Sequence, residues 1–262
     1  MIPRRYIQEW KAKAGWPLDS QVEQDLVISR SIAAIFSNEF LSEKLAFRGG
    51  TALYKLYLKP APRYSEDIDM VQVKAAPIKE IFDSLREVLL FLDKPAVKQK
   101  ADNNTMLFRF DSEILPIVRL KLKVEINCRE HFSVMDYHEV PFKVESGWFT
   151  GNCVVKTYHF DELIGTKLRA LYQRRKGRDL YDIYKALCSK QSNSQSILKC
   201  YREYMRYSVQ KVPSKKEFLI NIEAKMKEPE FLNDVKALLK PGEIYNSDTA
   251  FEIVKTKLID EM

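Results

Sequence analysis

Residues 118–127 alternate between apolar and polar side chains along their whole length. Successive side chains of a β-strand point to opposite faces, so this alternation predicts a strand with one buried face. The apolar face carries Val118, Leu120, Leu122, Val124 and Ile126. The polar face carries Arg119, Lys121, Lys123, Glu125 and Asn127.

Shorter strands are expected over residues 63–73 and 106–110, and a short apolar run over residues 45–47 ends at Gly49 and Gly50. A helix-like stretch over residues 52–57 follows the two glycines. Because glycine permits sharp turns and close approach of a ligand, this is a strand–turn–helix unit that can face a ligand.

Helical periodicity covers the beginning and the end of the chain. Apolar residues recur at helical spacing in the first 40 residues, where Asp19 and Ser20 are candidate caps, and again after Pro77. From Asp161 the pattern is helical almost to the end, and Gly177 divides one helix from the next. The order predicts an α+β fold: residues 1–157 form a core with a mixed or antiparallel sheet and N-terminal helices, and residues 158–262 form a helical C-terminal domain.

Composition excludes several classes of protein. Hydrophobic residues make up 45% and charged residues 30%, which argues against a disordered chain. The longest apolar run, residues 88–92, is far shorter than the ~20 residues of a membrane-spanning helix, and the first residues lack the pattern of a secretory signal. The four cysteines are widely spaced, so we expect free thiols, no zinc site and a cytoplasmic protein. A net charge of +7 is compatible with a polyanionic partner but is common.

Three acidic residues are candidates for metal binding. Asp67 and Asp69 are two residues apart in an expected strand, so both carboxylates project from one face, where a divalent cation would relieve their repulsion. The alternative is a solvated strand face. Glu125 would complete the cluster if its strand lay beside that of Asp67, but Lys123 and its basic neighbours leave an ordinary surface of mixed charge equally open.

A second group of charges lies in the helical part. Lys167 falls within the apolar stripe of its helix, so it must extend to solvent, pair with an acid or meet a ligand. Asp179 and Asp182 lie near each other on the next helix, where a helix cap and an ordinary salt bridge are the alternatives. Residues 167–178 form the densest basic stretch, which suits a triphosphate or RNA backbone, or else a solvated helix end.

Residues 47–53, Phe-Arg-Gly-Gly-Thr-Ala-Leu, and residues 63–69, Arg-Tyr-Ser-Glu-Asp-Ile-Asp, together resemble the AbiEii/AbiGii toxin family, which includes the MenT-type toxins. This family belongs to the polymerase-β-type nucleotidyltransferase superfamily. The segments over residues 167–182 and 229–234 are also similar to the family pattern, and the resemblance extends from Gln21 onward.

The resemblance implies a polymerase-β-type core and a toxin of a toxin–antitoxin or phage-defence system. It would transfer NMP from NTP to an acceptor, expected to be the 3′ end of tRNA, and would pair with an AbiEi-type antitoxin. Mg²⁺ or Mn²⁺ would be the cofactor. Alternatives are transfer to a protein or small molecule, or a protein of this fold that binds NTP or RNA without catalysis.

The resemblance and the residue pattern together give the expected site roles. Asp67, Asp69 and Glu125 would bind the metal, and Lys167 and Asp182 would join them as catalytic residues. The residues expected to contact the nucleotide are Gly49, Gly50, Thr51, Arg63, Ser65 and Asp179.

Overall fold

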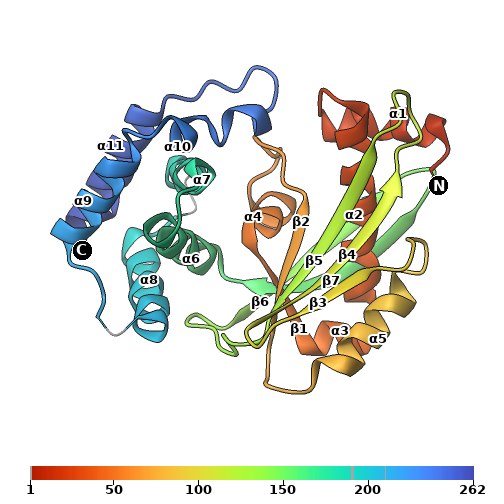
Figure 1. The fold of residues 1–262 in the computed structure, drawn as a ribbon, viewed down its shortest axis with the longest axis horizontal. Helices are drawn as coiled ribbons and strands as arrows, with labels where there is room; N and C mark the ends of the chain where they lie inside the picture. Colours follow the sequence, from red (N-terminus) through yellow and green to blue (C-terminus); the bar gives the residue numbers. More distant parts are fainter. Residues whose placement is uncertain (1, 190–191, 210) are drawn as a thin grey trace. The chain divides into compact units, whose positions relative to one another are not determined.

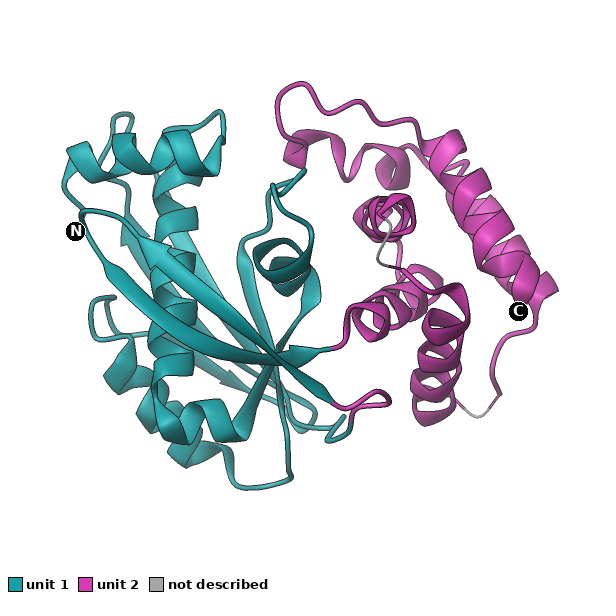
Figure 2. Ribbon diagram, turned by 180° about the vertical axis from the view of Figure 1, so that it is seen from behind, with its two compact units in different colours: residues 1–132, 137–158 teal, residues 133–136, 159–262 magenta. Residues whose placement is uncertain are grey.

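The computed structural model describes residues 2–189, 192–209 and 211–262. The chain divides into two compact units (Figure 2). Unit 1 contains residues 1–132 and 137–158, and unit 2 contains residues 133–136 and 159–262.

Unit 1 is built on one mixed sheet of seven strands in the order β3-β4-β5-β2-β1-β7-β6 (Figure 1). The β2–β5 and β1–β7 pairs are parallel, and the other neighbouring pairs are antiparallel. The strands are β1 Leu45–Arg48, β2 Asp67–Gln72, β3 Ala96–Gln99, β4 Asn103–Asp111, β5 Arg119–Asn127, β6 Tyr137–Glu145 and β7 Thr150–Tyr158. The mixed sheet with helices confirms the predicted α+β class.

The predicted strand over residues 118–127 is β5, and its apolar side chains from Leu120 to Ile126 are buried. The expected strand over residues 63–73 is shorter than predicted, because regular pairing begins only at Asp67. The sequence pattern does not predict β3, β6 or β7. Pro141 lies inside β6, and a proline is tolerated there because β6 is an edge strand.

Six helical segments belong to unit 1: α1 Arg4–Ala14, α2 Asp19–Ser37, α3 Glu39–Lys44, α4 Gly49–Ala52, the π-helix η1 Leu53–Tyr57 and α5 Ile78–Val88. Helix α2 packs on β5, β6 and β7 and is buried along most of its length. The expected cap of α2 is wrong, since Leu18 occupies the N-cap position without a side-chain hydrogen bond. Asp19 begins the helix instead and pairs with Lys11 of α1 at 2.7 Å.

Unit 2 is helical, as the periodicity predicted. Its helices are α6 Phe160–Gln173, α7 Gly177–Cys188, α8 Ser194–Ser208, α9 Lys215–Lys225, α10 Pro229–Asn233 and α11 Ser247–Lys257, with 3-10 turns η2 Lys236–Leu238 and η3 Ile259–Glu261. Helix α6 packs against α7, α8 and α9. Gly177 does begin α7, and a side chain there would collide with the Phe231 carbonyl, 2.0 Å from the position of a Cβ.

The short segment 133–136 belongs to unit 2 because a buried carboxylate of α6 holds it. Glu162 accepts hydrogen bonds from Ser133 Oγ at 2.8 Å, Val134 N at 2.8 Å and Met135 N at 2.9 Å. It also accepts a hydrogen bond from the hydroxyl of Tyr204 on α8 at 2.7 Å. In the described ranges, no helix combines the length and the apolar character needed to cross a membrane.

Candidate active site

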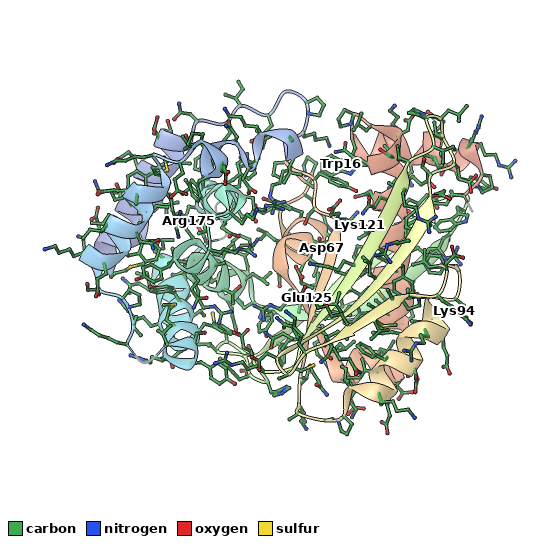
Figure 3. The ribbon with its side chains drawn as sticks, viewed as in Figure 1. Trp16, Asp67, Lys94, Lys121, Glu125 and Arg175 are labelled. Atoms are coloured by element: carbon green, nitrogen blue, oxygen red, sulfur yellow. The ribbon has the colours of Figure 1, made fainter. Side chains whose placement is uncertain are left out.

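The three predicted metal-binding carboxylates share one face of the sheet. Strand β2 runs parallel to β5, with Asp69 opposite Glu125 and Asp67 opposite Lys123. Because alternate residues of a strand share a face, Asp67 lies on the same side as Asp69 and Glu125. Figure 3 labels Asp67 and Glu125 on these neighbouring strands. The strand of Glu125 therefore lies beside the strand of the two aspartates, as its expected role in the cluster requires.

A lysine lies between two of these acids. The Lys123 ammonium is 3.1 Å from Asp67 Oδ2 and 3.1 Å from Glu125 Oε2. Both carboxylates hold the pKa of Lys123 well above its usual range, although burial acts in the opposite direction. Sequence reasoning missed this role and used Lys123 only as a reason to doubt Glu125. Its position two residues before Glu125 on one strand face is the signal that places it in the site.

The carboxyl group of Asp69 lies in an unfavourable electrostatic position. Burial raises its pKa, and the neighbouring Asp67 and Glu125 raise it further. Lys123 and Arg48 act in the opposite direction. Arg48 lies opposite Asp69 in the β1–β2 register, and its guanidinium pairs with Glu130 Oε2 at 2.7 Å. A further cation at this face would relieve the repulsion that remains.

Gly49 fits tightly against Asp69. Its φ of +80° is rarely adopted by other residues, and a Cβ built on it would lie 2.3 Å from Asp69 Oδ2. Glycine is therefore required for both the turn and the closeness of the carboxylate. Gly50 follows inside α4 and is buried.

Thr51 connects α4 to the start of β2. Its hydroxyl donates to the carbonyl oxygen of Asp67 at 2.5 Å, and its oxygen lies 2.9 Å from Ser65 Oγ. Since the single Thr51 proton is used on Asp67, Ser65 donates its proton to Thr51. Thr51 is buried, so it fixes the backbone that carries Asp67 and the hydroxyl of Ser65.

Two buried networks hold the segment between the glycine turn and β2. Lys55 of η1 donates to Asp25 Oδ1 at 2.8 Å, and Trp10 Nε1 donates to Asp25 Oδ2 at 2.9 Å, which fixes η1 to α2. Arg63 is almost fully buried; it donates to the Tyr64 carbonyl at 2.8 Å and lies over the Tyr54 ring at 4.9 Å. Through the Tyr64 carbonyl, Arg63 holds the backbone of the residue that precedes Ser65.

The predicted residues of unit 2 form a buried cluster of their own. Lys167 Nζ lies 2.7 Å from Asp182 Oδ2 and 3.4 Å from Asp179 Oδ1. Arg174 donates two hydrogen bonds to Asp179, at 2.6 and 2.8 Å. Of the three environments expected for Lys167, pairing with acids is the one observed. Asp179 orients both Lys167 and Arg174.

The basic stretch over residues 167–178 is largely neutralised inside unit 2. Arg178 makes a bidentate pair with Asp234, at 2.9 and 3.0 Å, and Lys176 lies 3.5 Å from the same carboxylate. Arg175 pairs with Glu228 at 2.9 Å. The similarity over residues 229–234 thus has a structural basis, since Asp234 joins the start of α7 to the end of α10.

The chemistry of the carboxylates in unit 1 fits a divalent cation. Aspartate and glutamate oxygens are the ligands that Mg²⁺ and Mn²⁺ prefer, and Asp67 and Asp69 would be the ligands, with Glu125 beside them. Within the residues that the structure describes, however, no group of three or more acidic, histidine or cysteine side chains converges on one point. The ammonium of Lys123 occupies the position between Asp67 and Glu125 instead.

A cavity of about 380 Å³ in unit 1 contains none of the predicted residues. It is lined in part by Gln72, Asn104, Cys128 and His131. Gln72 ends β2, whereas Asp67 begins it, so this cavity is separate from the carboxylates.

Comparisons with known proteins agree with this fold and show the family. A family model described as "Nucleotidyl transferase AbiEii toxin, Type IV TA system" matches residues 30–253. MenT4, a nucleotidyltransferase toxin from Mycobacterium tuberculosis, has a similar structure with a TM-score of 0.67 and 14% identity, over 100% of this chain and 91% of that chain. JHP933 from Helicobacter pylori has a TM-score of 0.59 and 15% identity, over 93% of each chain. No curated protein matches in sequence. Since the family model covers most of the sequence, the chain belongs to the nucleotidyl transferase AbiEii toxin family of type IV toxin–antitoxin systems, and it is a nucleotidyltransferase.

Proposed function

We propose that this toxin transfers NMP from NTP to the 3′ end of tRNA in a reaction that depends on Mg²⁺ or Mn²⁺. Membership in the family implies an NTP substrate and an antitoxin partner. The observation that carries the proposal is the shared sheet face of Asp67, Asp69 and Glu125, with Gly49 fitted against Asp69. The acceptor is the part taken from the family resemblance.

In this reaction an RNA 3′-hydroxyl attacks the α-phosphorus of NTP. One phosphorus–oxygen bond forms, the bond to the β-phosphate oxygen breaks, pyrophosphate leaves and the hydroxyl proton is released. Asp67 and Asp69 would hold the divalent cation, whose chemistry there is to neutralise charge on the triphosphate. Glu125 would accept the hydroxyl proton or act as a further ligand, and positioning of these groups would supply most of the catalysis.

The hydroxyl of Ser65 and the turn at Gly49 and Gly50 would contact the phosphates. Thr51 would position the Ser65 hydroxyl and the Asp67 backbone through its hydrogen bonds to both residues. In unit 2, we propose that Lys167 and Asp182 are required for transfer and that Asp179 orients Lys167. Arg63, being buried, would act by supporting Ser65.

The expected antitoxin is of the AbiEi type, and the expected compartment is the cytoplasm, where NTP and tRNA are found. The four free cysteines are consistent with a reducing compartment. Association with phage defence is part of the same proposal and is tested in cells carrying the toxin gene with and without its antitoxin.

The test is incubation of the protein with each labelled NTP, Mg²⁺ or Mn²⁺, and total tRNA, followed by mapping of the label. We expect one or more nucleotides to be added to the RNA 3′ end. Asp67→Asn should abolish labelling while keeping the fold. Asp111→Asn is the matched control, because Asp111 is an exposed acid of the same sheet that pairs with the exposed Arg119 and should leave labelling unchanged.

Absence of labelled RNA with all four nucleotides, from folded protein, would contradict the proposed acceptor. Label that migrates with a protein or a small molecule would reject tRNA and keep nucleotidyl transfer. Full labelling by Asp67→Asn would reject the assignment of the site itself.

A further inference from the structure

Lys123 is bound to two of the acids proposed for metal binding. Its ammonium is equidistant from Asp67 and Glu125, at 3.1 Å from each. The three side chains are about one-third exposed, at 32% for Lys123, 38% for Asp67 and 33% for Glu125. These ion pairs are therefore open to solvent, and exposed ion pairs are weak enough to exchange partners.

The ammonium of Lys123 and a divalent cation held by Asp67 and Asp69 compete for the carboxylate of Asp67. Both bind carboxylate oxygen atoms, and two positive charges a few ångströms apart repel each other. A metal ion that arrives alone must therefore displace the ammonium of Lys123. The displaced ammonium then loses its pairs with both carboxylates, and this loss opposes binding of the metal alone.

Arrival of the metal together with NTP removes this penalty. The triphosphate brings several negative charges to the same face, and a lysine has a flexible four-carbon stem that lets its ammonium move between neighbouring anions. The lost pairs with Asp67 and Glu125 can then be replaced by contacts with phosphate oxygens.

We propose that the ammonium of Lys123 neutralises Asp67 and Glu125 in the free enzyme. When metal and nucleotide bind together, this ammonium moves to the triphosphate. Lys123 is thus a nucleotide-binding residue and the cause of coupling between the two ligands: the metal alone binds weakly, and NTP makes it bind tightly. Such coupling is reciprocal, so the metal strengthens NTP binding by the same factor. The inference rests on the proposed metal site of Asp67 and Asp69.

Lys121 offers a matched control. It lies two residues before Lys123 on the same face of β5, is exposed, and forms no ion pair in the described part of the chain (Figure 3). Replacing it changes the net charge of the strand as replacing Lys123 does, but leaves the space between Asp67 and Glu125 filled.

The experiment measures Mn²⁺ binding to the full chain by electron paramagnetic resonance of free Mn²⁺, without catalysis. We expect Lys123→Met to bind Mn²⁺ alone about tenfold tighter than wild type, within the range usual for coupled sites. Lys121→Met should bind as wild type does. Lys123→Arg, which keeps the charge, should also bind weakly, and Asp67→Asn should lose binding.

The second measurement is affinity for an NTP analogue with a non-cleavable α,β-bond, at saturating Mn²⁺. Here we expect the opposite sign: Lys123→Met should bind the analogue about tenfold more weakly, and Lys121→Met normally. A gain for metal alone with a loss for nucleotide is the result that a merely structural lysine would not give.

Equal or weaker Mn²⁺ binding by Lys123→Met would overturn the inference, and loss of that binding in Asp67→Asn would still support the metal site. Unchanged analogue affinity would also overturn it. If neither wild type nor Lys123→Met binds Mn²⁺, the inference and the metal site both fail.

Discussion

Replacement of Gly49 by alanine tests how closely the glycine turn controls Asp69. The change has two separable costs. Gly49 has a φ of +80°, and an alanine held in the left-handed region costs about 1–2 kcal/mol of folding stability. The added Cβ would lie 2.3 Å from Asp69 Oδ2, where ordinary contacts begin at 3.4 Å, so the carboxylate must move by about 1 Å.

A displacement of that size affects catalysis more than stability. Misplacement of a reacting group by about 1 Å can lower a rate by about 10²-fold. We therefore expect Gly49→Ala to lose about 1–2 kcal/mol of stability and about two orders of magnitude in nucleotide transfer. The measurements are urea denaturation followed by circular dichroism, and the initial rate of label incorporation into RNA.

Gly242 separates the two costs. Its φ is +83°, almost the same as that of Gly49, and it is far from β2 in sequence. Among the described residues, no atom beyond its chain neighbours lies within 4 Å of the place that a Cβ would take. Gly242→Ala should lose a similar amount of stability and retain transfer. If Gly49→Ala transfers nucleotide as fast as Gly242→Ala, then close approach to Asp69 is not important for the reaction.

Three further outcomes are expected. Asp182→Asn removes a charged partner of the buried Lys167 and should lower the stability measured by urea denaturation by about 3–5 kcal/mol. Arg175→Met breaks an exposed pair and should change this stability by less than about 1 kcal/mol. Equal effects of the two variants would contradict the importance of burial. Burial raises the pKa of Glu23 from 4.5 to about 7, so the contribution of Glu23 to wild-type stability falls by about 3 kcal/mol as the pH rises from 4.5 through 7. Glu23→Gln should remove that loss, giving a higher urea midpoint at pH 8 and little change near pH 4.5, and parallel pH profiles would refute it. Glu162→Gln should speed hydrogen exchange at the amides of residues 134 and 135 beyond the effect of Tyr204→Phe, which removes one hydrogen bond; unchanged exchange would show that other contacts hold this segment.

Helical periodicity and strand alternation located most elements because both are local properties. The face that Asp67 and Asp69 share follows from their spacing alone, and β5 is recognisable from its alternation. The edge strands are harder. Strand β6 contains Pro141 and is largely exposed in its first half, and all of β3 is exposed, so neither has the one-sided apolar pattern of a central strand.

Helical periodicity and strand alternation do not show which distant segments of the chain pair with each other. From the sequence alone, Glu125 is equally well interpreted as a site residue or as an ordinary surface charge, because the residues of β5 do not indicate which strand lies beside it. It also does not decide whether the basic residues near α7 meet a ligand or internal acids. Their partners, Glu228 and Asp234, lie about fifty residues later in the chain.

The sequence by itself determined the α+β class, the helical C-terminal part, the glycine turn and the paired aspartates, since each depends on residues a few positions apart. Only the tertiary structure decided that Asp69 lies opposite Glu125, that Lys123 bridges Asp67 and Glu125, and that Lys167 is buried against two acids. The physical reason is that strand register and the choice of ion-pair partner depend on how the whole core packs, whereas periodicity records only which side of each element is buried.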